Sequence, residues 1–217
     1  MAHGYGRRQA IPAPGRDVSL ALPSLVDLFY AICQGLGLAL ATGLGGVIVP
    51  LFAAVLAHVD IGWSLDGTGW EFVGSEWFVA LLFALNVAWF VGRRRDLARP
   101  LVLAALVTLG AILFAASLAE DAATAWPGLI IGAAAAAGAA LIAHDVLGGA
   151  ARRAGVKDGP GADSGLLGLA ALAGVVLVAA SVFFPPLSIL ALAGLIALVL
   201  TRRRAGGRKF AGLRILR

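Results

Sequence analysis

Residues 24–59 read SLVDLFYAICQGLGLALATGLGGVIVPLFAAVLAHV, an apolar stretch that decides the fold class. A helix of about 20 residues crosses the hydrocarbon core of a bilayer, so this stretch is too long for one straight crossing. Its middle, Thr42-Gly43-Leu44-Gly45-Gly46 with Pro50 close behind, combines residues that interrupt or bend helices. We therefore expect one long first helix that is broken near residues 42–46. Two short spans and a re-entrant hairpin are the alternatives.

The rest of the chain has the same apolar character. Of its 217 residues 60% are hydrophobic and 13% are charged, whereas a soluble domain carries about 25% charged residues. The sequence predicts an all-α integral membrane protein of about six transmembrane helices in a single domain, residues 24–201. Residues 1–23 are predicted to form a flexible N-terminal tail and residues 202–217 a basic C-terminal tail. The predicted spans are about 31–59, 77–91, 100–118, 125–147, 164–184 and 186–201.

The distribution of charge predicts the orientation. All 17 Lys and Arg residues fall in the two tails and in the connections that follow the second and fourth predicted spans. The connection over residues 60–76 contains acids, Trp63 and Trp70 but no Lys or Arg. Basic residues remain on the cytoplasmic side, so both termini are expected in the cytoplasm. Tryptophan prefers the membrane interface, so part of the 60–76 connection is expected at the outer membrane surface. The basic clusters are candidate sites for anionic lipid headgroups. They lie between apolar segments rather than on one folded face, which argues against nucleic-acid binding.

Two segments of the chain match each other. Residues 53–58 read AAVLAH and residues 139–144 read AALIAH, and the same offset pairs Gly46 with Gly132. This match aligns the first predicted span with the fourth and indicates two halves of three spans. An odd number of spans per half inverts the second half, as in the inverted repeats of many secondary transporters. Chance similarity between alanine-rich helices is the alternative.

One segment resembles a known family. The run Gly35–Leu44, GLGLALATGL, with Pro50-Leu51 after it, resembles the first helix of the bacterial membrane family catalogued as domain-of-unknown-function family 4126. The closing Ala211–Arg214, with Lys209 upstream, is also similar to such proteins. The resemblance implies the plasma (inner) membrane of a bacterium and no established activity. The chain departs from the family pattern at Gly45-Gly46, where a polar or basic residue is expected.

The candidate functional residues are few, because charged groups at mid-membrane are almost absent. Unwound backbone inside a membrane faces protein or a water-filled cavity, so the segment Thr42–Gly46 is the first candidate, with close helix packing as its alternative. The pair His144-Asp145 is the second, since histidine titrates near neutral pH and could relay protons. The alternative is that both residues lie at the cytoplasmic surface of the membrane and have no relay function. The candidate substrate path comprises Gln34, Thr42, Gly43, Gly45, Gly46, Asn86, His144 and Asp145.

A stripe of small residues recurs every four positions in the fourth predicted span: Gly128, Gly132, Ala136 and Ala140. It allows close approach of another helix, either from the same chain or from a second copy in a homo-oligomer. The sequence contains no metal cluster, nucleophile–base arrangement or phosphate-binding loop, so no enzyme activity, catalytic residue, metal or cofactor is expected. We expect a small secondary transporter or lipid-translocating protein. The alternative is a non-catalytic accessory or scaffold protein.

Overall fold

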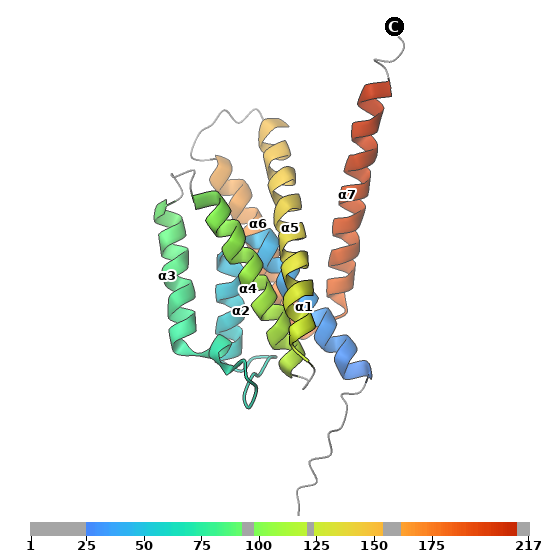
Figure 1. Ribbon diagram of the computed structural model, residues 1–217. Helices are drawn as coiled ribbons and strands as arrows, with labels where there is room; N and C mark the ends of the chain where they lie inside the picture. Colours follow the sequence, from blue (N-terminus) through green and yellow to red (C-terminus); the bar gives the residue numbers. More distant parts are fainter. Residues whose placement is uncertain (1–24, 93–97, 121–123, 154–161, 212–217) are drawn as a thin grey trace, which may run out of the picture.

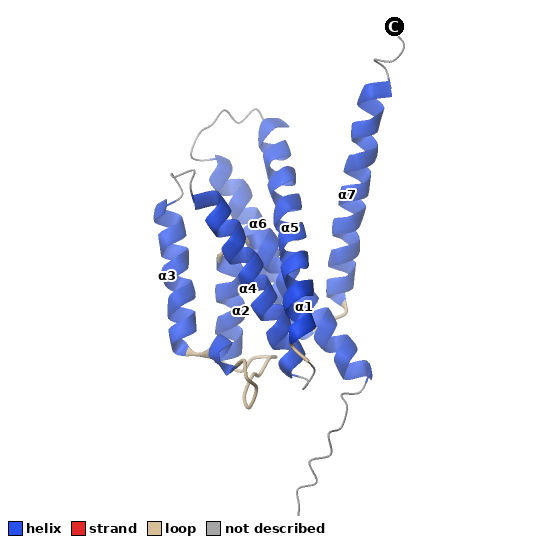
Figure 2. Cartoon of the chain, viewed as in Figure 1, coloured by secondary structure: helices blue, strands red, loops and turns tan. Residues whose placement is uncertain are grey.

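The computed structural model describes residues 25–92, 98–120, 124–153 and 162–211 (Figure 1). Regular structure in these ranges is entirely helical, which confirms the predicted class (Figure 2). Four helices, α1, α4, α5 and α6, are long and apolar enough to cross a membrane. The helices are α1 Leu25–Gly45, α2 Ile48–His58, the 3-10 turn η1 Glu71–Gly74, α3 Glu76–Gly92, α4 Ala98–Glu120, α5 Trp126–Arg153, α6 Ala162–Phe183 and α7 Leu187–Ala211.

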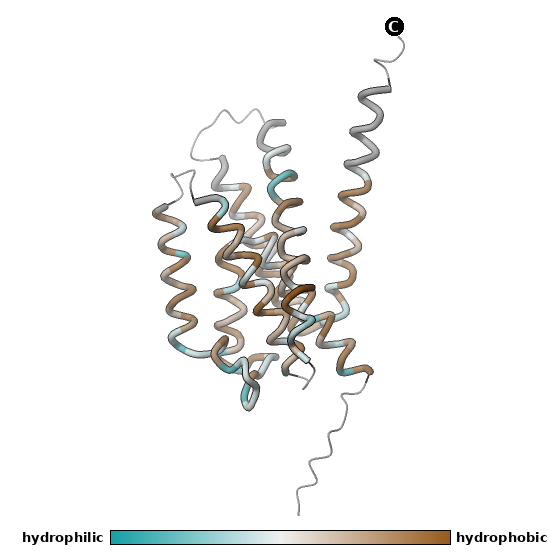
Figure 3. The backbone as a smooth tube through the Cα atoms, in the orientation of Figure 1, coloured by the Kyte–Doolittle hydropathy of each residue, from teal (hydrophilic) through white to brown (hydrophobic). Residues whose placement is uncertain are grey.

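The bundle has two chemically different ends. The connection between α2 and α3 contains Asp60, Asp66 and Glu71 and stands out as a hydrophilic segment beside apolar helices (Figure 3). We call this the acidic end. At the opposite end, α3 ends at Gly92, just before the Arg93-Arg94-Arg95 run of the sequence, and α5 closes with Arg152 and Arg153. We call this the basic end.

The first apolar segment is interrupted at a single glycine, as predicted. α1 ends at Gly45 and α2 begins at Ile48. Gly46 lies between them with a φ of 73°, in the left-handed region that glycine adopts without steric cost. Its N–H still donates to the carbonyl of Thr42 at 3.2 Å, and its own carbonyl accepts from Val49 at 3.2 Å. The interruption is therefore a hydrogen-bonded turn.

The chain reverses at this turn. Near the start of α1, the carbonyl of Ala31 accepts a hydrogen bond from Ser117 Oγ, in the last turn of α4, at 3.0 Å. After α2, the N–H of Ser64 donates to Glu120 Oε1, at the end of the same helix, at 3.2 Å. Between these points Gly43 lies against the middle of α5. α1 and α2 thus enter the bundle from the acidic end and return to it (Figure 1), which is the re-entrant alternative.

The predicted count of six spans is not confirmed. The helices α3 to α7 each run between the two ends of the bundle, whereas the α1–α2 hairpin does not (Figure 1). The prediction differs because the glycine turn reverses the chain, where a kink would have let it continue. The start of α1 and the end of α7 consequently lie at opposite ends. Residues 1–23, the predicted N-terminal tail, lie outside the described residues, and the predicted C-terminal tail is helical as far as Ala211.

Small residues determine how closely the helices pack. A Cβ at Gly128 would lie 3.0 Å from the Cα of Ala115 in α4, and a Cβ at Gly132 would lie 2.7 Å from the carbonyl oxygen of Gly110. The predicted stripe on α5 therefore packs within the chain: its glycines lie on α4, and Ala136 and Ala140 lie beside Gly43 of α1. α1 is the central element, since it contacts α4, α5, α6 and α7.

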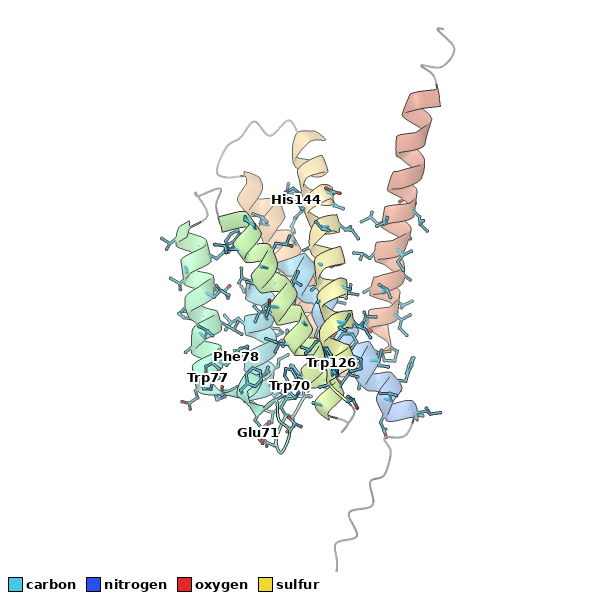
Figure 4. All side chains as sticks on the ribbon, in the orientation of Figure 1. Trp70, Glu71, Trp77, Phe78, Trp126 and His144 are labelled. Carbon is cyan, nitrogen blue, oxygen red and sulfur yellow. The ribbon has the colours of Figure 1, made fainter. Side chains whose placement is uncertain are left out.

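The predicted inverted repeat is not confirmed. The first and fourth predicted spans contact each other through α1 and α5, but the matched residues 53–58 lie in α2. His58 ends α2 at the acidic end, and His144 lies toward the opposite end of the bundle (Figure 4). However, Gly46 forms a chain reversal, while Gly132 lies inside the uninterrupted α5. His58 ends α2, while α5 continues beyond His144 to Arg153. The matching residues thus occupy unlike elements, as chance similarity of alanine-rich helices would produce.

Candidate functional site

The turn of the hairpin is held by a side chain from another helix. Asn86 of α3 donates through Nδ2 to the carbonyl of Val47 at 2.9 Å, and to the carbonyl of Leu82 in its own helix at 2.9 Å. A helix interruption frees backbone carbonyls, and inside a membrane such a group needs a partner within the protein. The structure thus brings Asn86 next to the glycine turn, although they are about forty residues apart in sequence.

The other polar and small residues of the interruption serve packing. The Thr42 hydroxyl is buried and donates to the carbonyl of Leu38 at 2.8 Å, within its own helix. A Cβ at Gly43 would overlap the carbonyl oxygen of Ala136 in α5, and one at Gly45 would lie 3.0 Å from the Cα of Gly174 in α6. The close-packing interpretation therefore holds for these two glycines.

Gly46 differs from its neighbours. No heavy atom outside its adjacent residues lies within 4 Å of the position that a Cβ would take. The tip of the hairpin is therefore the one part of the Thr42–Gly46 segment with open space beside a glycine. Together, Gly46, Val47 and Asn86 form a polar backbone site at the middle of the bundle, which we call the hairpin tip.

Gln34 lies apart from the hairpin tip, by about 18 Å of helix. It sits in the first half of α1, where the helix passes the ends of α4 and α6 nearest the acidic end. The side chain is 8% exposed, and its Nε2 has no hydrogen-bond partner among the described residues. Gln34 thus differs from Thr42, because the buried Thr42 hydroxyl has a hydrogen-bond partner and the Gln34 amide nitrogen has none among the described residues.

His144 and Asp145 lie neither at the hairpin tip nor beside Gln34. Both side chains are exposed on α5. Figure 4 shows His144 toward the end of the bundle opposite to Trp70, Trp77 and Trp126. Their exposure agrees with the interface interpretation rather than with a buried proton relay.

The predicted substrate path does not include a group of buried polar side chains around the first half of α1. Ser181 of α6 and Ser188 of α7 face Gly37, whose absent Cβ would overlap Ser181. A side-chain hydrogen bond joins Ser188 to Cys33. The sequence carries a weak signal for Ser188, which follows Pro185-Pro186 and donates back to the carbonyl of Pro185 at 2.7 Å.

Trp63 belongs to the loop that is predicted to reach the outer membrane surface, but its side chain is buried in the protein. Its side chain is 1% exposed and packs in the core cluster with Leu38, Leu113 and Val182. Its indole Nε1 has no hydrogen-bond partner among the described residues. The loop sequence could not reveal this, because the burial depends on helices distant in the chain.

Other aromatic residues do form a belt at the acidic end. Trp70, Phe72, Trp77 and Phe78 stack or meet edge to face, with ring centroids 5.5–6.3 Å apart (Figure 4). Trp77 is 60% exposed and Trp126 is 66% exposed. Exposed tryptophans at one level of an apolar bundle are typical of a membrane interface.

No family model matches the chain, and no curated protein or solved structure is significantly similar to it. The resemblance to family 4126 therefore stays a prediction. Among the residues that the structure describes, no three His, Cys, Asp or Glu side chains gather as metal ligands.

Proposed function

We propose that the protein is a small, non-enzymatic carrier that moves a lipid or another amphiphilic molecule across a membrane. The proposal depends on one observation: the α1–α2 hairpin turns back at the middle of the bundle, at the hairpin tip. Secondary transporters place their substrate sites near the bilayer midplane, beside helices that are interrupted there. The turn at Gly46 places an interrupted, hydrogen-bonded backbone and the Asn86 amide at that depth.

The chemistry of the interior limits the cargo. Among the side chains that the structure describes, the buried polar ones are all neutral: Gln34, Thr42, Ser117, Ser181 and Ser188. Coupled pumps and transporters carry protons on Asp, Glu or His inside the membrane, and these described positions offer none. We therefore propose uncoupled movement of an amphiphile down its own gradient.

We further propose an orientation in a bacterial inner membrane. Basic residues favour the cytoplasmic side, so the basic end faces the cytoplasm and the acidic end faces outward. Because the hairpin starts at the acidic end, the first turn of α1 and the end of α7 then lie on opposite sides of the membrane, whereas the sequence prediction places both termini in the cytoplasm. Anionic lipid headgroups would gather at the basic end.

The test is lipid exchange between leaflets in vesicles that contain the purified protein. A phospholipid with a fluorescent nitrobenzoxadiazole headgroup is bleached by external dithionite only in the outer leaflet. When the protein is present, we expect dithionite to bleach more of the fluorescence than the share that starts in the outer leaflet. Bleaching equal to that of empty vesicles would refute the proposal for lipids.

Two variants connect the assay to the hairpin tip. Asn86→Ala removes the bond to the Val47 carbonyl, worth about 1 kcal/mol, and should change the rate by about fivefold. Thr108→Val is the matched control, because the exposed Thr108 hydroxyl bonds only to its own helix, at the carbonyl of Ala104. Equal exchange rates in the two variants would show that translocation does not depend on the hairpin tip.

The second candidate is an accessory or scaffold protein. It is favoured by the close contacts that Gly43, Gly45 and Gly132 make with neighbouring backbones, which leave little room for rearrangement. A scaffold would leave lipid exchange at the level of empty vesicles, so the same assay separates the two functions.

A further inference from the structure

Two buried N–H donors in the described residues have no acceptor. They are Gln34 Nε2 and Trp63 Nε1, in side chains that are 8% and 1% exposed. Native proteins satisfy nearly all buried polar groups, because an unmade hydrogen bond carries the full cost of desolvation. Each donor therefore needs an acceptor from outside the chain, either a water molecule or a ligand.

Both donors border the same part of the core. Gln34 lies one helical turn before Leu38, so the two side chains share a face of α1. Leu38 belongs to the core cluster that includes Trp63, together with Leu113 of α4 and Val182 of α6. Gln34 on α1 thus lies beside this cluster, and Trp63, in the loop after α2, belongs to it.

The depth of the two residues is also the same. The glycines beside Gln34 contact Ser117 and Ser181, in the last turns of α4 and α6. The neighbours of Trp63 contact Glu120 and Val182, in those same turns. The donors therefore lie just inside the acidic end, at the level where the apolar core meets the interfacial region of a bilayer.

We propose that Gln34 and Trp63 bind a neutral oxygen acceptor of a membrane-borne ligand, of the ester carbonyl or hydroxyl type that a diacylglycerol carries. Two N–H donors require an acceptor, and oxygen is the acceptor that such lipids supply. The surrounding cluster is apolar, so an anion would be buried there without a counter-charge, at a high cost. The inference deepens the proposed function by naming a ligand class, and it rests on that function only in taking the ligand from the membrane.

The experiment measures thermal unfolding of the delipidated full-length protein in detergent, with and without dioleoylglycerol. At about ten times the Kd, we expect Tm to rise by roughly 3–6 °C. Gln34→Met and Trp63→Phe each remove one donor while keeping most of the side-chain volume, and both should lose the rise. Trp77→Phe is the control, because Trp77 is an exposed tryptophan at the same end, and it should keep the rise.

Several outcomes would overturn the inference. An unchanged Tm in the wild type would exclude the ligand class, and an equal rise in wild type and both donor variants would show that the donors do not bind it. A larger rise with dioleoyl phosphatidic acid would show that the site prefers an anion. An equal rise with water-soluble diacetylglycerol would refute the membrane source. If one donor variant fails to fold, the other still shows whether the donors bind the ligand. The unfolding measurement does not depend on lipid exchange in vesicles, so its failure is distinguishable from failure of the proposed function.

Discussion

At the scale of single residues, Gly46 decides the path of the chain. Its φ of 73° costs a residue with a Cβ roughly 1–2 kcal/mol, while glycine has no such penalty. The space beside it is open, so a side chain there would be disfavoured by backbone conformation alone. This separates the conformational role of Gly46 from the packing role of Gly43 and Gly45.

The first prediction follows from that separation. Gly46→Ala should lower Tm by roughly 2–8 °C, because the cost comes from the left-handed backbone. Gly138→Ala is the control: Gly138 lies within α5, a Cβ there would meet no neighbour, and alanine favours helix by about 1 kcal/mol. Thermal unfolding in detergent measures both. A Gly46→Ala variant as stable as the wild type would show that the turn does not need its glycine.

At the scale of elements, α1 is the helix around which the others pack. Its small residues bring three neighbours close: Gly35 meets α4, Gly43 meets α5 and Gly45 meets α6. Lipid is as apolar as a leucine side chain, so helices in a membrane associate through close contact rather than by excluding water. The glycines of α1 therefore hold the α1–α2 hairpin inside the bundle.

The second prediction concerns the contact between α1 and α5. Gly43→Ala places a methyl group on the carbonyl oxygen of Ala136, a backbone atom that cannot rotate away. We expect the two helices to separate, at a cost of roughly 1–3 kcal/mol. Gly168→Ala in α6, where a Cβ meets open space, should show no loss. If both variants unfold at the wild-type temperature in detergent, the close contact between α1 and α5 is not required.

At the scale of the whole molecule, the hairpin determines on which side the described chain begins. Five helices, α3 to α7, run between the two ends, and the hairpin adds none. The first turn of α1 should therefore be accessible from the same side as the connection between α2 and α3. A first helix that crossed the membrane would place these two segments on opposite sides.

The third prediction tests this arrangement in intact cells. In a Cys33→Ala background, Val26→Cys and Asp66→Cys should both react with an impermeant maleimide. Both residues are exposed in the structure. Lys157→Cys, in the basic connection between α5 and α6, should react only after permeabilisation. Reaction of Val26→Cys only after permeabilisation would restore the six-span arrangement and contradict the hairpin.

The sequence alone determined the membrane class, the approximate positions of α3 to α7, and the interruption near Gly46. These features depend on local properties: the length of apolar segments, the backbone freedom of glycine, and the separation of acidic from basic connections. Only the tertiary structure decided that the chain turns back after Gly46, that Asn86 caps the Val47 carbonyl, and that Trp63 is buried with its N–H unpaired. The physical reason is that each of these depends on contacts between residues distant in the chain, which apolar periodicity does not encode.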